Sequence, residues 1–129
     1  MTALPELARE LIDGQNFASV ATIQADGSPQ SSIVWVRRDG DDVLFSTVKG
    51  RRKHANLLAD PRVSLLVTDV VNPYRYAEIR GGATVTDDLR AELIQELAGK
   101  YTGQAFATRP GDERVIVRIV PDRVVVYDD

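Results

Sequence analysis

Residues 45–67 read FSTVKGRRKHANLLADPRVSLLV, and this stretch is the most informative part of the chain. In a chain whose formal net charge is −3, residues 49–53 bring four cationic side chains together between two apolar, β-rich segments. The order predicts a strand, a basic turn that opens a short helix, and a second strand. A helix start has free backbone N–H groups and the positive end of the helix dipole. Arg51 and Lys53 beside it therefore indicate a site for a phosphate or carboxylate group.

A basic helix start also has a simpler interpretation, a solvated charged face. Lys and Arg oppose the dipole there and repel one another, at a cost of about a few tenths of a kcal/mol that a bound anion would relieve. The residues alone leave both interpretations open.

The segments before this stretch predict a helix and a set of antiparallel strands. Apolar residues recur at helical spacing over residues 4–12, and Gly14 follows as a stop. Two β-rich runs, 17–23 and 30–37, flank a turn sequence and predict a hairpin, and a third strand is expected at 43–47.

The segments after it extend this pattern. We expect strands at 62–68, at 75–86 with a bulge at Gly81-Gly82, and at 114–127 as one or two strands interrupted by Pro121. Between them, Asp87 or Asp88 is expected to cap a helix that presents Leu89, Leu93, Ile94, Leu97 and Tyr101 on one face. Six or seven short antiparallel strands with inserted helices predict a mainly β fold, a small β-barrel, in a single domain spanning residues 1–129.

Composition excludes several classes of function. The chain has no cysteine, which excludes disulfides, iron–sulfur clusters and thiol nucleophiles. The mildly acidic balance disfavours a nucleic-acid surface, and neither a signal peptide nor a membrane span is indicated. A cytoplasmic location is the simplest expectation.

The side chains offer little catalytic chemistry of their own. His54 is the single histidine and is expected to be structural, and the aspartates at 39, 41 and 42 form a hairpin turn rather than a metal site. We therefore predict no catalytic side chain and no metal. A bound cofactor could carry the reaction instead, with the basic cluster as its anchor. Trp35, Tyr74 and Tyr76 are candidates for a ring site, although barrel packing or a dimer interface would also explain them.

Four motifs, in this order and spacing, resemble a known superfamily. They are Val20-Ala21-Thr22 followed by Asp26–Gln30, then Phe45-Ser46-Thr47, then Arg51–Leu57, then Asp60–Val63. They are similar to the pyridoxamine 5′-phosphate oxidase-like, FMN-binding split β-barrel superfamily, and within it to the actinobacterial B-type oxidoreductases that use the deazaflavin coenzyme F420. The resemblance covers nearly the whole chain. It implies a homodimeric split barrel with the cofactor in a groove between the subunits.

The resemblance also implies which residues bind the cofactor. Arg51 and Lys53 would hold its phosphate, while Thr47, Val48 and Lys49 would approach the ribityl chain and ring. Gln30, Ser31, Ser32 and Ile33 would face the ring system. The loop of Asn72, Pro73 and Tyr74 would reach the groove of the other subunit.

The implied activity is hydride transfer from reduced deazaflavin to an electron-poor small molecule such as a quinone, an enone or a tetrapyrrole. Two alternatives stay open. FMN carries a phosphate that Arg51 and Lys53 would accept equally well, so the protein could be an FMN-dependent oxidase or reductase. It could also be a non-catalytic carrier of a flavin-like ligand.

Overall fold

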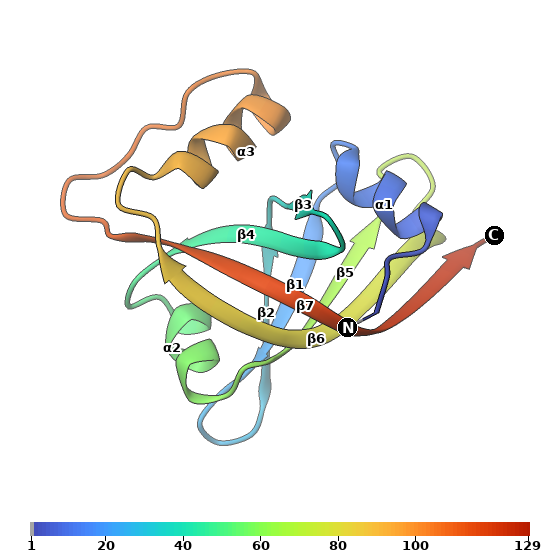
Figure 1. The fold of residues 1–129 in the computed structure, drawn as a ribbon, viewed down its shortest axis with the longest axis horizontal. Helices are drawn as coiled ribbons and strands as arrows, with labels where there is room; N and C mark the ends of the chain where they lie inside the picture. The colour runs from blue at the N-terminus through green and yellow to red at the C-terminus, as the bar shows by residue number, and fades with distance from the viewer. Residues whose placement is uncertain (1) are drawn as a thin grey trace.

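The computed structural model describes residues 2–129 as a curved sheet with three helices (Figure 1). The helices are α1 (Glu6–Asp13), α2 (Arg52–Ala59) and α3 (Glu92–Thr102). The strands are β1 (Ala18–Ile23), β2 (Pro29–Val34), β3 (Arg37–Asp39), β4 (Asp42–Val48), β5 (Arg62–Thr68), β6 (Arg75–Asp87) and β7 (Arg114–Asp128). None of the helices that these residues form combines the length and hydrophobicity that a membrane span requires.

The strands form one antiparallel sheet in the order β2-β1-β5-β6-β7-β4-β3. Its two edge strands, β2 and β3, follow each other in the sequence and are joined by Trp35 and Val36 alone. The sheet must therefore curl until its edges meet, which makes it a barrel. This confirms the mainly β fold, with seven strands.

One predicted strand is wrong in its extent. Residues 30–37 were expected to be continuous, but the segment splits between β2, which pairs with β1, and β3, which pairs with β4. The last predicted element, by contrast, is not interrupted at its proline. Residues 114–128 form one strand, because Pro121 lies opposite Gly81 at a register shift where Asp122 is the extra residue on β7. The register shift lies at the glycine pair where a bulge or bend was predicted, but the extra residue belongs to β7 rather than to β6.

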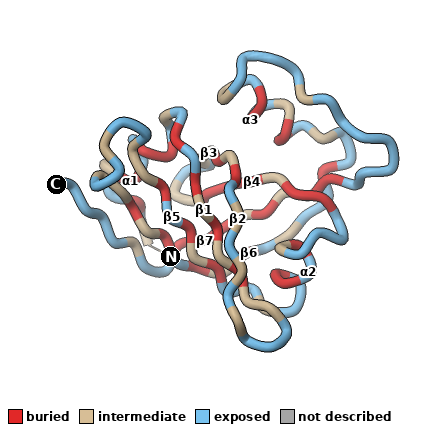
Figure 2. The backbone as a smooth tube through the Cα atoms, turned by 180° about the vertical axis from the view of Figure 1, so that it is seen from behind, coloured by how far each residue is buried: buried red, intermediate tan, exposed pale blue. Residues whose placement is uncertain are grey.

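The core lies inside the barrel, where alternate residues of β1, β5 and much of β6 are buried (Figure 2). Val20, Phe45, Leu65, Ile79 and Val117 belong to it, and α1 covers one end with Leu11 and Ile12. On the outer face of β4, a smaller cluster joins Leu44 to Leu93 and Leu97 of α3. Helix α3 is thus held outside the barrel, where it can form a wall beside β4.

The start of α3 differs in detail from the prediction. Asp88 does cap the helix: its carboxylate accepts hydrogen bonds from the backbone N–H groups of Glu92 (3.0 Å) and Leu93 (2.9 Å). The helix begins only at Glu92, because Ala91 adopts the left-handed conformation with φ of 53°. Leu89 therefore precedes the helix and is exposed rather than part of its apolar face.

Candidate functional site

The barrel is split beside β4. Strand β3 pairs only with Asp42–Leu44, so residues 45–48 of β4 pair with β7 on one side and have no strand partner within residues 2–129 on the other. A groove of about 270 Å³ opens here, and residues of both β2 and β4 line it. Its lining is Phe17, Ile33, Val34, Trp35, Ser46, Arg51, Lys53, Ile94, Leu97, Phe106 and Arg114.

Three cations meet in this groove, from two separate parts of the chain. Arg51 is the N-cap residue of α2, Lys53 lies in its first turn, and Arg114 begins β7. Among the described residues that line the groove, none is acidic. Burial, and then the charges of Arg51 and Arg114, lower the pKa of Lys53. Three mutually repelling cations with no carboxylate in the groove lining are an arrangement that favours the binding of an anion.

Arg114 is the most deeply buried of the three, with 8% of its surface exposed. Its Nη1 donates a hydrogen bond to Ser46 Oγ at 3.4 Å, and its guanidinium carbon lies 4.9 Å from the centroid of the Phe106 ring. Burial, and then the charge of Arg51, lower its pKa, while the charges of Asp112 and Asp88 act in the opposite direction without forming an ion pair with it. Burying a cation without a carboxylate partner costs stability, which an incoming anion would recover.

The start of α2 supports the same kind of ligand. No described side chain caps this helix, so the positive end of its dipole stays open beside Arg51 and Lys53. His54, in the same turn, is buried, and its Nδ1 accepts a hydrogen bond from the backbone N–H of Gly50 at 3.1 Å. The imidazole thus stabilises the turn that presents Arg51.

An aromatic wall leads to the cations. Tyr101 lies against Phe17 (ring centroids 5.7 Å apart) and stacks on Trp35 (5.4 Å). Trp35 meets Phe106 edge to face at 6.4 Å. Phe17, Trp35 and Phe106 line the groove, so a planar ring with an anionic arm matches its two ends.

The structure brings three of the twelve predicted binding residues into this groove, namely Ile33, Arg51 and Lys53. Of the rest of the β2 group, Ser31 is exposed, while Gln30 and Ser32 are half-buried on the opposite face of the strand. Gln30 Oε1 and Ser32 Oγ are inaccessible to solvent and have no hydrogen-bond partner within residues 2–129. Among the aromatic candidates, Trp35 lines the groove, whereas Tyr76 stacks on Tyr127 (5.3 Å).

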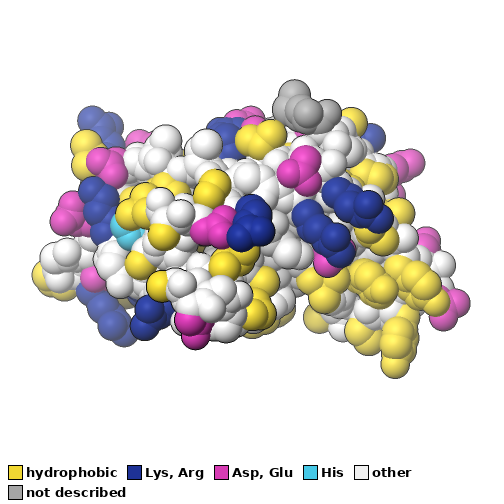
Figure 3. Space-filling view, turned by 90° about the horizontal axis from the view of Figure 1, so that it is seen from below, with side chains coloured by type: hydrophobic (Ala, Val, Ile, Leu, Met, Phe, Trp, Pro, Cys, Tyr) yellow, Lys and Arg dark blue, Asp and Glu magenta, His cyan; other side chains and the backbone are white. Residues whose placement is uncertain are grey.

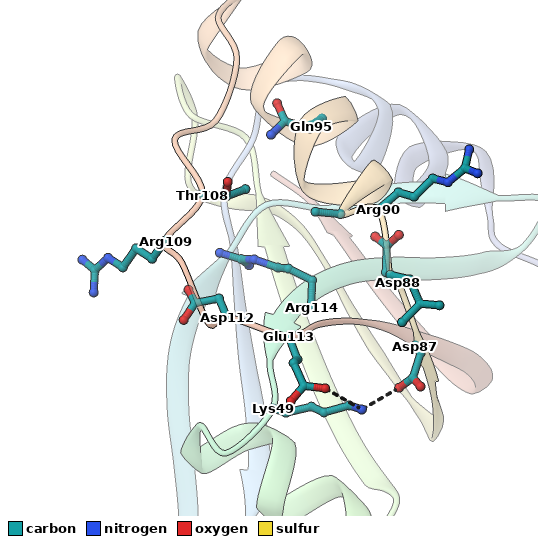
Figure 4. A pocket seen from close by; sticks show the side chains of 12 residues that line it. Lys49, Asp87, Asp88, Arg90, Gln95, Thr108, Arg109, Asp112, Glu113 and Arg114 are labelled. Atoms are coloured by element: carbon teal, nitrogen blue, oxygen red, sulfur yellow. Dashed lines mark hydrogen bonds and ion pairs between the residues drawn. The ribbon is translucent and has the colours of Figure 1, made fainter.

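The predicted residues of β4 lie around the groove rather than in its lining. Thr47 is fully buried on the core side of the strand, next to Val115 of β7, and Val48 is also buried. Lys49 turns away and forms ion pairs with Asp87 (3.1 Å) and Glu113 (3.4 Å), as Figure 4 shows. Burial of Thr47 and Val48, and the ion pairs of Lys49, thus leave little of these side chains for a ligand in this chain.

The loop of Asn72, Pro73 and Tyr74 is also absent from the groove lining. It connects β5 to β6 at the end where Arg75 binds Glu10 of α1, and α2 lies elsewhere on the barrel (Figure 1). Asn72 Oδ1 accepts a hydrogen bond from the backbone of Tyr74, whose side chain is exposed. A role in this groove would therefore require the loop of another subunit.

Sequence reasoning missed Arg114, Phe106 and the α3 residues Ile94 and Leu97. Arg114 was taken as the first residue of an apolar strand, and only the pairing of Val48 with Arg114 places it beside the basic turn. A lone arginine at the start of a buried strand was the available signal, because a buried cation requires a partner.

Comparison with known proteins places the chain in a family. The profile of the pyridoxamine 5′-phosphate oxidase family matches residues 4–127. The chain belongs to this family. Its split β-barrel agrees with the architecture predicted from the sequence. No curated protein matches the chain.

Solved structures with the same fold include members of different kinds. An F420 reductase is 30% identical to this family member, with a TM-score of 0.85 over 95% of this chain and 98% of the reductase. A conserved hypothetical protein from Mycobacterium tuberculosis is 25% identical, with a TM-score of 0.77 over 93% of this chain and 81% of the other. An FMN-binding protein from Nostoc punctiforme, related to pyridoxamine 5′-phosphate oxidase, is 15% identical, with a TM-score of 0.64 over 85% and 72% of the two chains. This last likeness concerns the fold alone.

Proposed function

We propose that this protein is an oxidoreductase that binds coenzyme F420 in the groove and reduces an electron-poor small molecule. The observation that carries the proposal is the cluster of Arg51, Lys53 and Arg114 at the end of an aromatic-walled groove. Similarity to an F420 reductase over nearly the full length of both chains favours the deazaflavin. FMN is the alternative cofactor, because its phosphate suits the same three cations.

The residues of the groove fit such a cofactor. Three cations suit a phosphate, and the apolar side chains of Trp35 and Phe106 suit a planar ring.

The side chains of the groove would have separate roles in binding the cofactor. Arg51, Lys53 and Arg114 would bind the phosphate, and the aromatic wall would orient the ring and exclude water from its face. The reduced cofactor would supply the hydride when bound. The lining offers no histidine or carboxylate to move a proton, so the acceptor would take its proton from solvent. A quinone, an enone or a tetrapyrrole has the electron-poor character that this chemistry requires.

Titration of the purified protein with F420, FMN and riboflavin tests the proposal. We expect F420 to bind more tightly than FMN, and riboflavin, which lacks the phosphate, to bind weakest. Tighter binding of FMN would assign the protein to the FMN-dependent alternative, and failure of all three to bind would contradict the proposal. Turnover with reduced F420 and a panel of quinones then separates a reductase from a non-catalytic carrier.

Substitution of Arg51 or Lys53 by alanine is expected to weaken F420 binding about tenfold or more, because a charge-assisted contact contributes roughly 1.5–3 kcal/mol. Affinity should also fall as pH rises through the lowered pKa of Lys53, since the phosphate prefers the charged amine. Arg52→Ala is the matched control, because Arg52 is adjacent and exposed and lies outside the groove lining. Equal affinities in all three variants would mean that the basic cluster is only a solvated charged face and does not bind the phosphate.

We also propose that the protein forms a homodimer whose second subunit completes the groove. Exposed apolar side chains lie on the β5–β6 loop and at the end of β7: Val70, Val71, Tyr74, Val125, Val126 and Tyr127. Hydrophobic side chains form a continuous area at the right-hand end of the face in Figure 3. An area of this kind on a small domain is typically covered by another chain.

Sedimentation is expected to show a dimer at micromolar concentration. Val71→Asp or Tyr127→Asp should shift it towards monomer, because each introduces a charge at an apolar contact. A stable monomer of the unmodified protein would contradict the shared groove.

A further inference from the structure

Arg114 lines two cavities. One is the groove with its three cations. The other, of about 390 Å³, lies between the start of α3 and the segment before β7, and Arg114 lines it as well. Figure 4 shows the Arg114 side chain extending across this second cavity towards the segment that carries Thr108 and Arg109.

The two cavities differ in the partners that they offer to the guanidinium. The second cavity contains carboxylates, most of which are already engaged: Asp87 and Glu113 pair with Lys49, and Asp88 caps α3. Asp112 also lines it and forms no ion pair within residues 2–129. A guanidinium free to rotate would move towards this carboxylate and be neutralised there.

Phe106 opposes that movement. Its ring faces the guanidinium, with 4.9 Å between the Arg114 carbon and the ring centroid. The segment from Gly103 to Glu113 has no helix or strand, but Gln95 of α3 fixes Phe106 within it by two hydrogen bonds. Gln95 Nε2 donates to the carbonyl of Phe106 at 3.0 Å, and Gln95 Oε1 accepts from its N–H at 2.9 Å.

We propose that Phe106, tethered by Gln95, positions Arg114 for an anion in the groove and away from Asp112, and so sets the preference for phosphorylated ligands. The inference rests on the proposed function, because it assumes that the groove binds a ring with a phosphate arm. Phe106 is thus a positioning residue that acts through Arg114. The aromatic ring is a weak partner that leaves the N–H groups of the guanidinium free for phosphate, whereas a carboxylate would occupy them.

The ratio of FMN affinity to riboflavin affinity tests this, because the two probes differ only by the phosphate. We expect Phe106→Leu to lower the ratio about fivefold or more, since it removes the ring face that holds the guanidinium. Gln95→Leu should act in the same direction, whereas Phe106→Tyr should keep the ratio of the unmodified protein. Adding Asp112→Asn to Phe106→Leu should restore much of the ratio, because the competing carboxylate is gone.

Phe17→Leu is the matched control, since Phe17 belongs to the same wall but contacts Tyr101 rather than Arg114. It should weaken both probes together and leave the ratio unchanged. Melting curves of each variant confirm folding. If the unmodified protein prefers FMN and the ratio in Phe106→Leu and Gln95→Leu stays within about twofold of its value, the inference is overturned and the proposed function is not. Absence of binding of FMN, F420 and riboflavin to the unmodified protein would overturn the proposed function with it.

Discussion

Arg114→Met is expected to weaken the binding of F420 and FMN by about 10- to 100-fold, the largest effect on affinity that we anticipate from a single substitution. Arg114 is more than nine-tenths buried and forms no ion pair with a carboxylate of the described residues, so its contact with phosphate is poorly screened. Riboflavin affinity should change little.

Stability is expected to move in the opposite direction. Methionine keeps the apolar stem of the arginine but removes a buried cation that Arg51 and Lys53 repel, so the melting temperature should stay equal or rise. Arg123→Met, at an exposed position on the same strand, should change neither affinity nor stability. Unchanged FMN affinity in Arg114→Met would remove Arg114 from the site.

Gly81→Ala is expected to destabilise the fold by about 3 kcal/mol, because the added Cβ would clash with backbone atoms of the neighbouring strand. A Cβ built on Gly81 would lie 2.1 Å from the carbonyl oxygen of Val120 and 2.9 Å from its carbonyl carbon. Both are backbone atoms of the paired strand, so β6 and β7 would have to separate where they bulge.

Thermal melts should show this as a fall in melting temperature of roughly 10 °C. The adjacent Gly82→Ala supplies the control, because its Cβ would meet no atom within 4 Å. That variant should be neutral or slightly more stable, since alanine lowers the entropy of the unfolded chain. Equal stabilities of the two variants would show that the close approach of the strands at Gly81 relaxes at little cost.

Local sequence signals predicted the elements best where one residue type forces the outcome. Asp60-Pro61 marked the end of α2 and the start of β5, because the residue before proline disfavours helix. The change from β2 to β3 gave no such signal. Val34 and Val36 are both buried, so the alternation continues while the pairing partner changes from β1 to β4. Pairing partners are a tertiary property that periodicity does not record.

The same limit applied to the site. Arg51 and Lys53 lie together in the sequence, and the motif they form was recognisable. Arg114 and Phe106 come from a region more than fifty residues away, and only the pairing of β4 with β7 and the packing of α3 bring them to the groove. Lys49 is the opposite case. It lies next to the basic motif in the sequence and was therefore predicted to bind the cofactor, but its side chain pairs with Asp87 and Glu113 outside the groove.

The interior position of β7 in the sheet affects how the protein folds during its synthesis. β7 pairs with β6 on one side and with β4 on the other, although it is the last strand in chain order. During synthesis the ribosome therefore releases β1 to β6 before the strand that joins β4 to the rest of the sheet. Until β7 emerges, the facing edges of β4 and β6 are unpaired, and a chaperone or a neighbouring nascent chain can bind them. Closure of the barrel, and with it the meeting of Arg114 with Arg51 and Lys53, is thus a late step of folding.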